Sequence, residues 1–285
     1  MRRQPRCAIL PANNADRRER KLAELDQSEL NADAEALIEA MTRPKRRARP
    51  RLAEPLREAV ERDVTTDFGR IRAWRLGRGP AVLLLHGWDD DNSLWSPLIG
   101  RFAERGRAVV VIDLPGHGFS TAEDPSLAAA CAAVLAVAGE LGPIDALVGH
   151  SFGAVIITRC LAEGLPAKRV GLVGTPTLRA ERRWERARRA GTPEDVIARA
   201  AEIYAARAAE FEPRYDIEAA AATMTVPALF LHALDDEQCP VAETEALCRL
   251  WPGAKIALGD GLGHRLIAQD PMMMKRIVDF IDADG

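Results

Sequence analysis

The stretch "DALVGHSFGAVIITRC", residues 145–160, places a serine between two glycines where two apolar runs meet. The run before Gly149 is typical of the end of a short buried strand, and the run after Gly153 of the start of a helix. A strand that turns directly into a helix strains the corner residue, and flanking side chains would crowd the turn. Glycines at both flanks remove that crowding and leave the Ser151 hydroxyl exposed. The pattern predicts a nucleophile at a strand–helix corner.

Composition sets the limits of what such a chain can be. Its 285 residues, 47% of them apolar, suit one large domain or one domain with an appendage. No run of about 18 apolar residues exists, so we expect no membrane insertion. The basic residues 1–21 contain too short an apolar stretch for a signal peptide, which predicts a cytoplasmic protein. A net charge of −3 gives no overall attraction to nucleic acid.

Cofactor motifs are missing from the sequence. The five cysteines are odd in number and scattered, without the C-x-x-C spacing of zinc or redox sites. There is no phosphate-binding G-x-x-x-x-G-K-[ST], no G-x-G-x-x-G after the first parallel strand, and no histidine pair at ligand spacing. We therefore expect no metal and no organic cofactor.

The first part of the chain differs from the rest. Residues 1–59 are charged and poor in aromatics, and we interpret them as an N-terminal extension that is partly helical, with an amphipathic helix over 20–41. Prolines in the Arg/Pro segment 43–51 prevent a helix and favour an extended linker. We interpret this segment as a solvated hinge. A nucleic-acid contact is disfavoured because the segment has no aromatic side chains for base stacking.

From residue 60 to 283 the pattern changes to strands that alternate with helices. Residues 62–77 are typical of a hairpin that turns at 67–69. Short apolar runs follow at 81–86, 108–113, 145–150, 169–174, 228–233 and 254–259, and helical stretches at 93–105, 127–141, 152–164, 241–250 and 271–281. Continuous apolar strands between helices predict an α/β fold with a parallel sheet covered on both faces.

One connection is too long for a plain crossover and predicts an inserted helical cap over about 176–224. Trp184 and Tyr204 in this cap either line an acyl pocket or hold the cap in place. Arg182, Arg186 and Arg189 share one helical face, which is either a solvated surface or an attraction for an anionic substrate tail.

A serine hydroxyl needs a neighbouring base, and catalytic side chains gather at the carboxyl ends of parallel strands. All five histidines lie at a strand end or in the loop after one, and most need no catalytic role. His264 follows the last strand in a glycine-rich loop, which makes it the candidate base. Asp235 and Asp236 follow the preceding strand, and either carboxylate could fix the imidazole tautomer. The chain order is then serine, acid, histidine.

Donors for a developing oxyanion complete the set. The backbone N–H of Trp88, after the first parallel strand, and that of Phe152, after the serine, are the two candidates. The neighbouring run Asp89 to Asp91 would oppose an oxyanion if it were buried, so we expect these carboxylates to face solvent. Selection of a cationic substrate is the alternative.

With these motifs in place, the chain from about residue 60 to 283 resembles the α/β-hydrolase superfamily, in its serine-nucleophile, esterase/lipase-like branch. The motifs that carry the resemblance are "HGW", "DLPGHGFS" (113–120), "GHSFGA" (149–154), "HALDDEQCP" (232–240) and "GLGH" (261–264). The resemblance implies a mostly parallel eight-stranded sheet with a cap after strand 6 and a nucleophile elbow at Ser151. It also implies an acid after strand seven and a histidine after strand eight. Asp236 matches the family acid by position, but Ala233 stands where the family has glycine, so Asp235 also stays a candidate.

The resemblance also implies an activity. A serine at the elbow excludes the dehalogenases and soluble epoxide hydrolases of this superfamily, which need an aspartate there. We expect a carboxylesterase-like enzyme that cleaves an ester of a small molecule through an acyl-enzyme. Thioesterase, carbon–carbon bond hydrolase, and cofactor-free perhydrolase or acyltransferase activities use the same triad and stay open. A non-catalytic binding protein is the third class, although such a protein would have no need of all three triad residues. The oligomeric state is open.

Overall fold

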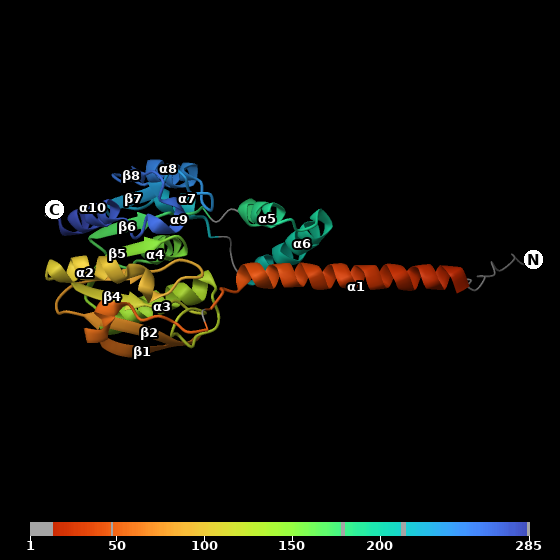
Figure 1. Ribbon diagram of the computed structural model, residues 1–285, viewed down its shortest axis with the longest axis horizontal. Helices are drawn as coiled ribbons and strands as arrows, with labels where there is room; N and C mark the ends of the chain where they lie inside the picture. Colours follow the sequence, from red (N-terminus) through yellow and green to blue (C-terminus); the bar gives the residue numbers. More distant parts are fainter. Residues whose placement is uncertain (1–13, 47, 178–179, 212–214, 284–285) are drawn as a thin grey trace, which may run out of the picture. The chain divides into compact units, whose positions relative to one another are not determined.

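The computed structural model describes residues 14–46, 48–177, 180–211 and 215–283. These residues form two compact units (Figure 1). The first unit comprises helix α1 (Asn14–Thr42) up to Met41, together with α5 (Ala180–Arg189) and α6 (Glu194–Phe211). The second unit starts at Thr42 and contains the sheet and all other helices. The expected boundaries at residue 60 and at about 176–224 stay predictions.

An eight-stranded sheet forms the centre of the second unit, in the order β1-β2-β4-β3-β5-β6-β7-β8. The hairpin β1 and β2 is antiparallel, and the turn lies at Asp67 and Phe68, as its sequence predicts. Strand β2 also pairs antiparallel with β4, and the strands from β3 to β8 pair with one another in parallel. The strands are β1 (Val60–Thr66), β2 (Gly69–Leu76), β3 (Ala81–Leu85), β4 (Ala108–Ile112), β5 (Ile144–His150), β6 (Arg169–Val173), β7 (Ala228–Ala233) and β8 (Lys255–Gly259).

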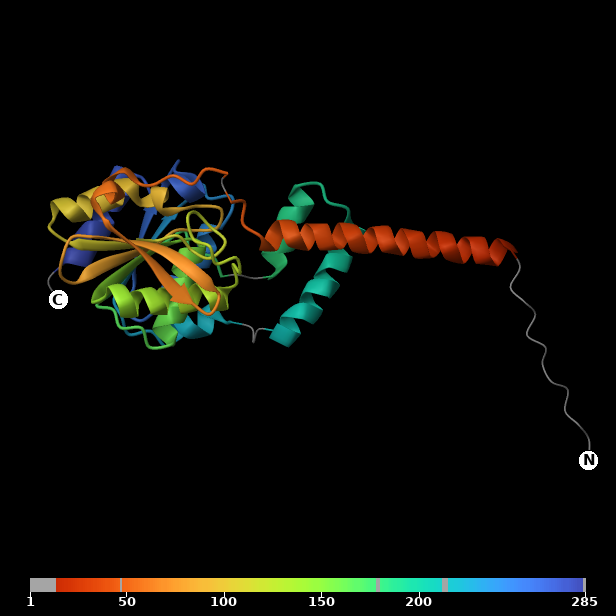
Figure 2. The same ribbon diagram turned by 90° about the horizontal axis from the view of Figure 1, so that it is seen from below.

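Helices cover both faces of this sheet, because its central strands are apolar on both sides. In β3, Leu83 and Leu85 face one core while Val82 and Leu84 face the other, as the alternation along a strand requires. One core packs against α3 (Leu127–Leu141), α4 (Phe152–Ala162), α7 (Ile217–Ala222) and α8 (Val241–Leu250), and the other against α2 (Ser96–Glu104) and α10 (Pro271–Asp282). Figure 2 shows the yellow α2 and the green α3 on opposite sides of the sheet. The predicted fold class is therefore confirmed.

Three short helices were not predicted. One, the 3-10 helix η1 (Glu54–Glu58), precedes β1, and the other two lie in loops at the carboxyl ends of strands. A 3-10 helix, η2 (Asn92–Trp95), precedes α2 because the Asp91 carboxylate accepts from the Ser93 N–H. A single turn, α9 (Gly263–Leu266), carries His264. Short polar turns of this kind lack the apolar periodicity on which sequence prediction depends.

The first unit joins the N-terminal helix to the insertion between β6 and β7. Its core contains Ala34 and Ile38 of α1 and Ala200 of α6, with Trp184 and Tyr204 packed against it. The Trp184 and Tyr204 rings meet edge to face, with centroids 6.1 Å apart. Polar contacts support the same packing: the Arg199 guanidinium donates to the Asn31 side chain at 2.7 Å, and Arg207 pairs with Glu35. Both aromatic rings thus hold this unit together.

Two arginines of α5 lie close to acidic side chains, and two others are exposed. Arg188 forms two hydrogen bonds with the Glu194 carboxylate, at 2.9 and 2.6 Å. Arg182 lies 3.5 Å from the Glu185 carboxylate, and Arg186 and Arg189 are exposed. The predicted common face therefore contains two exposed guanidinium groups.

Residues 43–46 and 48–51 form no helix or strand, as the prolines predict, and they contact the second unit at a few points. The Lys45 N–H donates to the Asp89 carboxylate at 2.5 Å, and the Arg46 guanidinium donates to the Ser120 carbonyl. Further along, the Ala53 N–H donates to the Asn92 side chain at 2.8 Å. The segment is mostly exposed, and one backbone N–H and one guanidinium group in it have acceptors in the loops after β3 and β4. Its role as a solvated hinge stays a prediction. The first 13 residues and Arg47 lie outside the described residues.

Two features are absent from the described residues. No helix there is long and apolar enough to cross a membrane. No group of three or more histidine, cysteine or acidic side chains in the same residues is arranged to hold a metal ion. Cys131, Cys160 and Cys248 are free thiols, Cys239 is half-buried, and Cys7 lies outside the described part of the chain.

The close approach of α4 to β3 generates a test of the fold. A methyl group on Gly153 would lie 2.4 Å from the Leu85 carbonyl oxygen and 2.6 Å from that of His86. Gly153→Ala should therefore lower the free energy of unfolding by about 2 kcal/mol or more. The matched change Gly139→Ala, at an exposed position of α3 with open space around it, should raise it by roughly 0.5–1 kcal/mol. Urea unfolding of both variants measures the two signs, and equal effects would contradict the packing argument.

Candidate active site

The corner between β5 and α4 holds Ser151 in a strained backbone conformation, with φ 51° and ψ −116°. Its N–H donates to the Val173 carbonyl at 2.8 Å, which ties the corner to β6. A methyl group on Gly149 would lie 2.6 Å from the backbone of Gly153. The predicted reason for glycine at these two positions is confirmed. The strain turns the Ser151 side chain to the carboxyl edge of the sheet.

The loop after β3 lies directly against this corner. A methyl group on Gly87 would lie 3.1 Å from Ser151 Cβ and 2.9 Å from His150 Nδ1. The Trp88 and Phe152 rings meet edge to face, with centroids 5.4 Å apart. In the described part of the chain, neither the Trp88 nor the Phe152 backbone N–H has an acceptor. The two residues that carry the predicted oxyanion donors are thus neighbours, and neither N–H is used by another described residue.

Asp236 and His264, which are 28 residues apart in the sequence, are in contact. Asp236 Oδ2 lies 2.6 Å from His264 Nδ1 and 3.2 Å from His232 Nε2. Its other oxygen accepts from the N–H groups of Gln238 at 2.9 Å and Cys239 at 2.8 Å. Burial raises the pKa of Asp236, but hydrogen bonds from His232 and His264 outweigh burial and hold the pKa well below its usual range. Asp236 is therefore a fixed carboxylate.

This carboxylate determines which nitrogen of His264 is protonated. An ionised acceptor at Nδ1 requires the proton there, so Nε2 keeps its lone pair and can accept a proton. A methyl group on Gly174 would lie 3.3 Å from His264 Cε1 and 3.7 Å from His150 Nε2. The His264 ring centroid is 4.8 Å from that of His150, the residue before Ser151. The candidate base thus lies beside the serine corner.

Ser151 itself is half-buried, and its hydroxyl makes no hydrogen bond to any residue that the structure describes. Catalytic hydrogen bonds are often long in a free enzyme and shorten when substrate binds. A hydroxyl in this position is open to an incoming carbonyl group.

Asp235, the other candidate acid, lies beside the site but does not contact His264. It is exposed, and its carboxylate accepts from the backbone N–H groups of Leu262 and Gly263, each at 3.1 Å. The bond from Gly263, with smaller contributions from its neighbours, lowers the pKa of Asp235. This carboxylate therefore supports the loop that carries the histidine.

The expectation that Asp89 to Asp91 face solvent was wrong for two of the three residues. Asp89 is exposed, with φ 61°, whereas Asp90 and Asp91 are buried. Asp91 caps η2 through the Ser93 N–H at 3.1 Å. Asp90 forms an ion pair with Arg265, the residue after His264. A positive partner from a distant loop makes this burial possible, and such a partner cannot be identified from local sequence.

The remaining histidines are packed and hydrogen-bonded. His86 Nε2 accepts from the Leu114 N–H at 3.0 Å, and His117 Nδ1 lies 2.8 Å from the Pro115 carbonyl. His150 Nε2 donates to the His264 carbonyl at 2.8 Å. His232 contacts the Asp236 carboxylate, a supporting role that the sequence analysis missed. Its only sequence signal is the four-residue spacing between His232 and Asp236.

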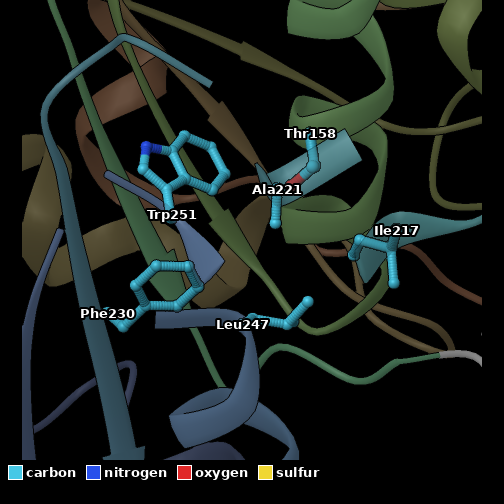
Figure 3. A pocket seen from close by; sticks show the side chains of 6 residues that line it. All are labelled: Thr158, Ile217, Ala221, Phe230, Leu247 and Trp251. Atoms are coloured by element: carbon cyan, nitrogen blue, oxygen red, sulfur yellow. The ribbon is translucent and has the colours of Figure 1, made fainter. Parts of the chain in front are cut away.

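A small apolar niche lies elsewhere, between α4, α7, α8 and β7 (Figure 3). The space between its atoms amounts to about 130 Å3, which includes some open solvent at its mouth. Inside the niche no single space is wide enough for a water molecule. Its lining residues are Thr158, Ile217, Ala221, Phe230, Leu247 and Trp251. The niche is a gap in core packing and contains none of the candidate catalytic residues.

Comparison of the sequence with known proteins agrees with this arrangement. Residues 82–279 match the model of the alpha/beta hydrolase family. A pimeloyl-[acyl-carrier protein] methyl ester esterase from Methylococcus capsulatus is 41% identical over 112 residues, which are 38% of this chain and 42% of that protein. A bifunctional epoxide hydrolase 2 from Sus scrofa is 32% identical over 93 residues, 31% of this chain and 17% of that protein. The chain thus spans less than half the length of the curated relatives it matches.

Solved structures extend the similarity of fold over most of the chain. The esterase RhEst1 from Rhodococcus sp. ECU1013 superimposes with a TM-score of 0.63 at 23% identity, covering 80% of this chain and 99% of that chain. The carboxylesterase CesB from Bacillus subtilis gives a TM-score of 0.62 at 16% identity, covering 90% and 100%. At these identities the similarity establishes the fold.

The buried His150 generates a prediction for stability against pH. Burial, with the nearby His264 as the second cause, lowers the pKa of His150 to about 3. As the pH falls below about 6.5, the unfolded chain binds a proton at this residue and the folded chain does not. The contribution of His150 to the free energy of unfolding is therefore fully present above pH 6.5 and is lost progressively as the pH falls towards 3. Between pH 7 and pH 5 this residue should reduce the free energy of unfolding by about 2 kcal/mol.

Urea unfolding of the native chain and of His150→Gln at both pH values measures this contribution. The variant keeps a donor for the His264 carbonyl and should lose correspondingly less stability on acidification. Equal losses in the two proteins would contradict the assignment.

Proposed function

Because the chain belongs to the alpha/beta hydrolase family, we propose that it is a serine hydrolase that cleaves a carboxylic ester of a small molecule. Ser151 is the nucleophile, His264 the base and Asp236 the acid. The backbone N–H groups of Trp88 and Phe152 form the oxyanion hole. The observation that carries the proposal is the 2.6 Å contact between Asp236 and His264, at the same sheet edge as the strained Ser151 corner.

The geometry supports the following reaction. Nε2 of His264 accepts the Ser151 proton as the serine oxygen attacks the ester carbonyl. Negative charge on the former carbonyl oxygen is stabilised by the Trp88 and Phe152 N–H groups, which have no acceptor in the described residues. His264 then gives its proton to the leaving alcohol, and an acyl-enzyme remains. A water molecule, deprotonated by His264, attacks the acyl group and releases the acid and the free serine.

An ester is favoured over the other substrates of this chemistry by the relatives. The curated relatives named methyl ester esterases share up to 41% identity with part of this chain. Thioesterase, carbon–carbon bond hydrolase, and perhydrolase or acyltransferase activities use the same residues, and a panel of substrates distinguishes them. Residence in the cytoplasm belongs to the proposal as well.

The direct test uses the native chain and Ser151→Ala on esters, thioesters and diketones of matched acyl length. Ester turnover should dominate, and the alanine variant should lose at least about 10³-fold in kcat because no nucleophile remains. A fluorophosphonate probe should label the native chain at one serine and leave Ser151→Ala unlabelled. Ester hydrolysis by the alanine variant at the native rate would refute the proposal.

The two neighbouring aspartates provide a matched pair. Asp236→Asn should lower kcat by about 10³-fold or more, because an amide no longer fixes the productive His264 tautomer. Asp235→Asn should change kcat by less than about tenfold, since Asp235 supports only the loop backbone. Steady-state kinetics on one ester compares them directly. If Asp235→Asn lowered kcat more than Asp236→Asn, Asp235 would be the triad acid and Asp236 the supporting residue.

A further inference from the structure

An ion pair joins two of the loops that form the proposed site. Arg265, the neighbour of His264 on α9, pairs through its guanidinium with Oδ1 of Asp90 in the loop after β3. The Asp90 side chain is only 4% exposed, and that of Arg265 is 45% exposed. A carboxylate is rarely buried without a charged or hydrogen-bonded partner. This pair is therefore a built feature of the site edge.

The pair belongs to a ring of contacts around the catalytic corner. The other oxygen of Asp90 lies 3.8 Å from Nδ1 of His150. His150 Nε2 is 2.8 Å from the carbonyl of His264, whose peptide bond leads back to Arg265. The contacts thus bring the loops after β3 and β8 against His150 at the end of β5. The ring includes the residues adjacent to Ser151 and to the base.

Asp90 also closes the turn that carries an oxyanion donor. Its N–H donates to the Gly87 carbonyl at 3.3 Å, so Trp88 lies inside the turn, next to Asp89 with its left-handed φ of 61°. A turn with a non-glycine residue in this conformation is strained and needs an external restraint. The ion pair between Arg265 and Asp90 supplies such a restraint.

We propose that Asp90 and Arg265 are positioning residues, which together hold the His264 loop and the Trp88 turn in register across Ser151. The inference rests on the proposed function, since it assigns roles relative to that triad. Neither side chain needs to touch substrate.

Electrostatics gives the pair a second role. An unpaired carboxylate beside the Trp88 turn would oppose negative charge on the substrate oxygen and would favour a protonated His264. The guanidinium neutralises it. The charged groups near His264 are Asp236 from the loop after β7 and Arg265 beside it. The neutral His150 ring from β5 lies against His264, and Asp90 lies on the other side of His150.

A double-mutant cycle on the full chain tests the proposal. Arg265→Gln should lower kcat for a simple ester by about 10-fold to 100-fold, with KM changed by less than about threefold, because the loops lose their alignment. The acidic limb of its kcat/KM profile should move to higher pH, since Asp90 is left uncompensated. Asp90→Asn should lower kcat without that shift. The double variant should be no slower than the slower single variant.

Two further variants control for trivial effects. Arg265→Lys keeps the positive charge and should recover part of kcat, and its acidic limb should match that of the native chain. Arg276→Gln removes an exposed arginine from α10 and should behave like the native chain. Melting temperatures report folding. If Asp90→Asn does not fold, the contrast between Arg265→Gln, Arg265→Lys and Arg276→Gln decides the question.

Multiplicative losses in the cycle, or a native kcat and pH profile in Arg265→Gln, would overturn the positioning role. Both results are distinct from failure of the proposed function, which Ser151→Ala reports independently. A chain that loses activity in Ser151→Ala but not in Arg265→Gln is a serine hydrolase whose loops need no such pair.

Discussion

The strained backbone at Ser151 is the constraint on which the rest of the site depends. A φ of 51° is tolerated only because glycines on both sides let α4 start within van der Waals contact of β3 and β5. The same approach brings Gly87 to within about a methyl group of the Ser151 side chain. Trp88 and Phe152, the residues that follow Gly87 and Ser151, have backbone N–H groups with no acceptor in the described residues. One local strain thus holds the Ser151 corner against the loop that carries Gly87 and Trp88.

Around this corner the sheet edge is held by buried carboxylates rather than by apolar packing. Asp236 has four hydrogen-bonding partners, which keep it ionised although it is buried. Asp113, at the end of β4, accepts from the Asn92 and Phe119 N–H groups, and its burial raises its pKa to about 6. Asp90 is neutralised by a guanidinium from another loop. Each carboxylate joins loops that follow different strands, which gives the edge its rigidity.

The N-terminal segment is more than an appendage to this arrangement. Its helix contributes Ala34 and Ile38 to a core shared with the insertion between β6 and β7. The residues that follow it are bonded through Lys45 and Arg46 to the loops after β3 and β4. The segment connects to both units through ordinary packing and hydrogen bonds, although nothing in its sequence resembles the family.

The sequence by itself determined the alternation of strands and helices, the corner at Ser151 and the order of serine, acid and histidine. These features depend on local periodicity, on glycines at fixed spacing and on motifs of a few residues. Only the tertiary structure brought Asp236 rather than Asp235 into contact with His264, buried Asp90 beside Arg265, and placed Trp184 and Tyr204 in a core with the N-terminal helix. Each of these depends on partners tens to hundreds of residues away, and local sequence contains no information about such pairings. A charged side chain can be buried only where the fold places an oppositely charged or hydrogen-bonding group beside it.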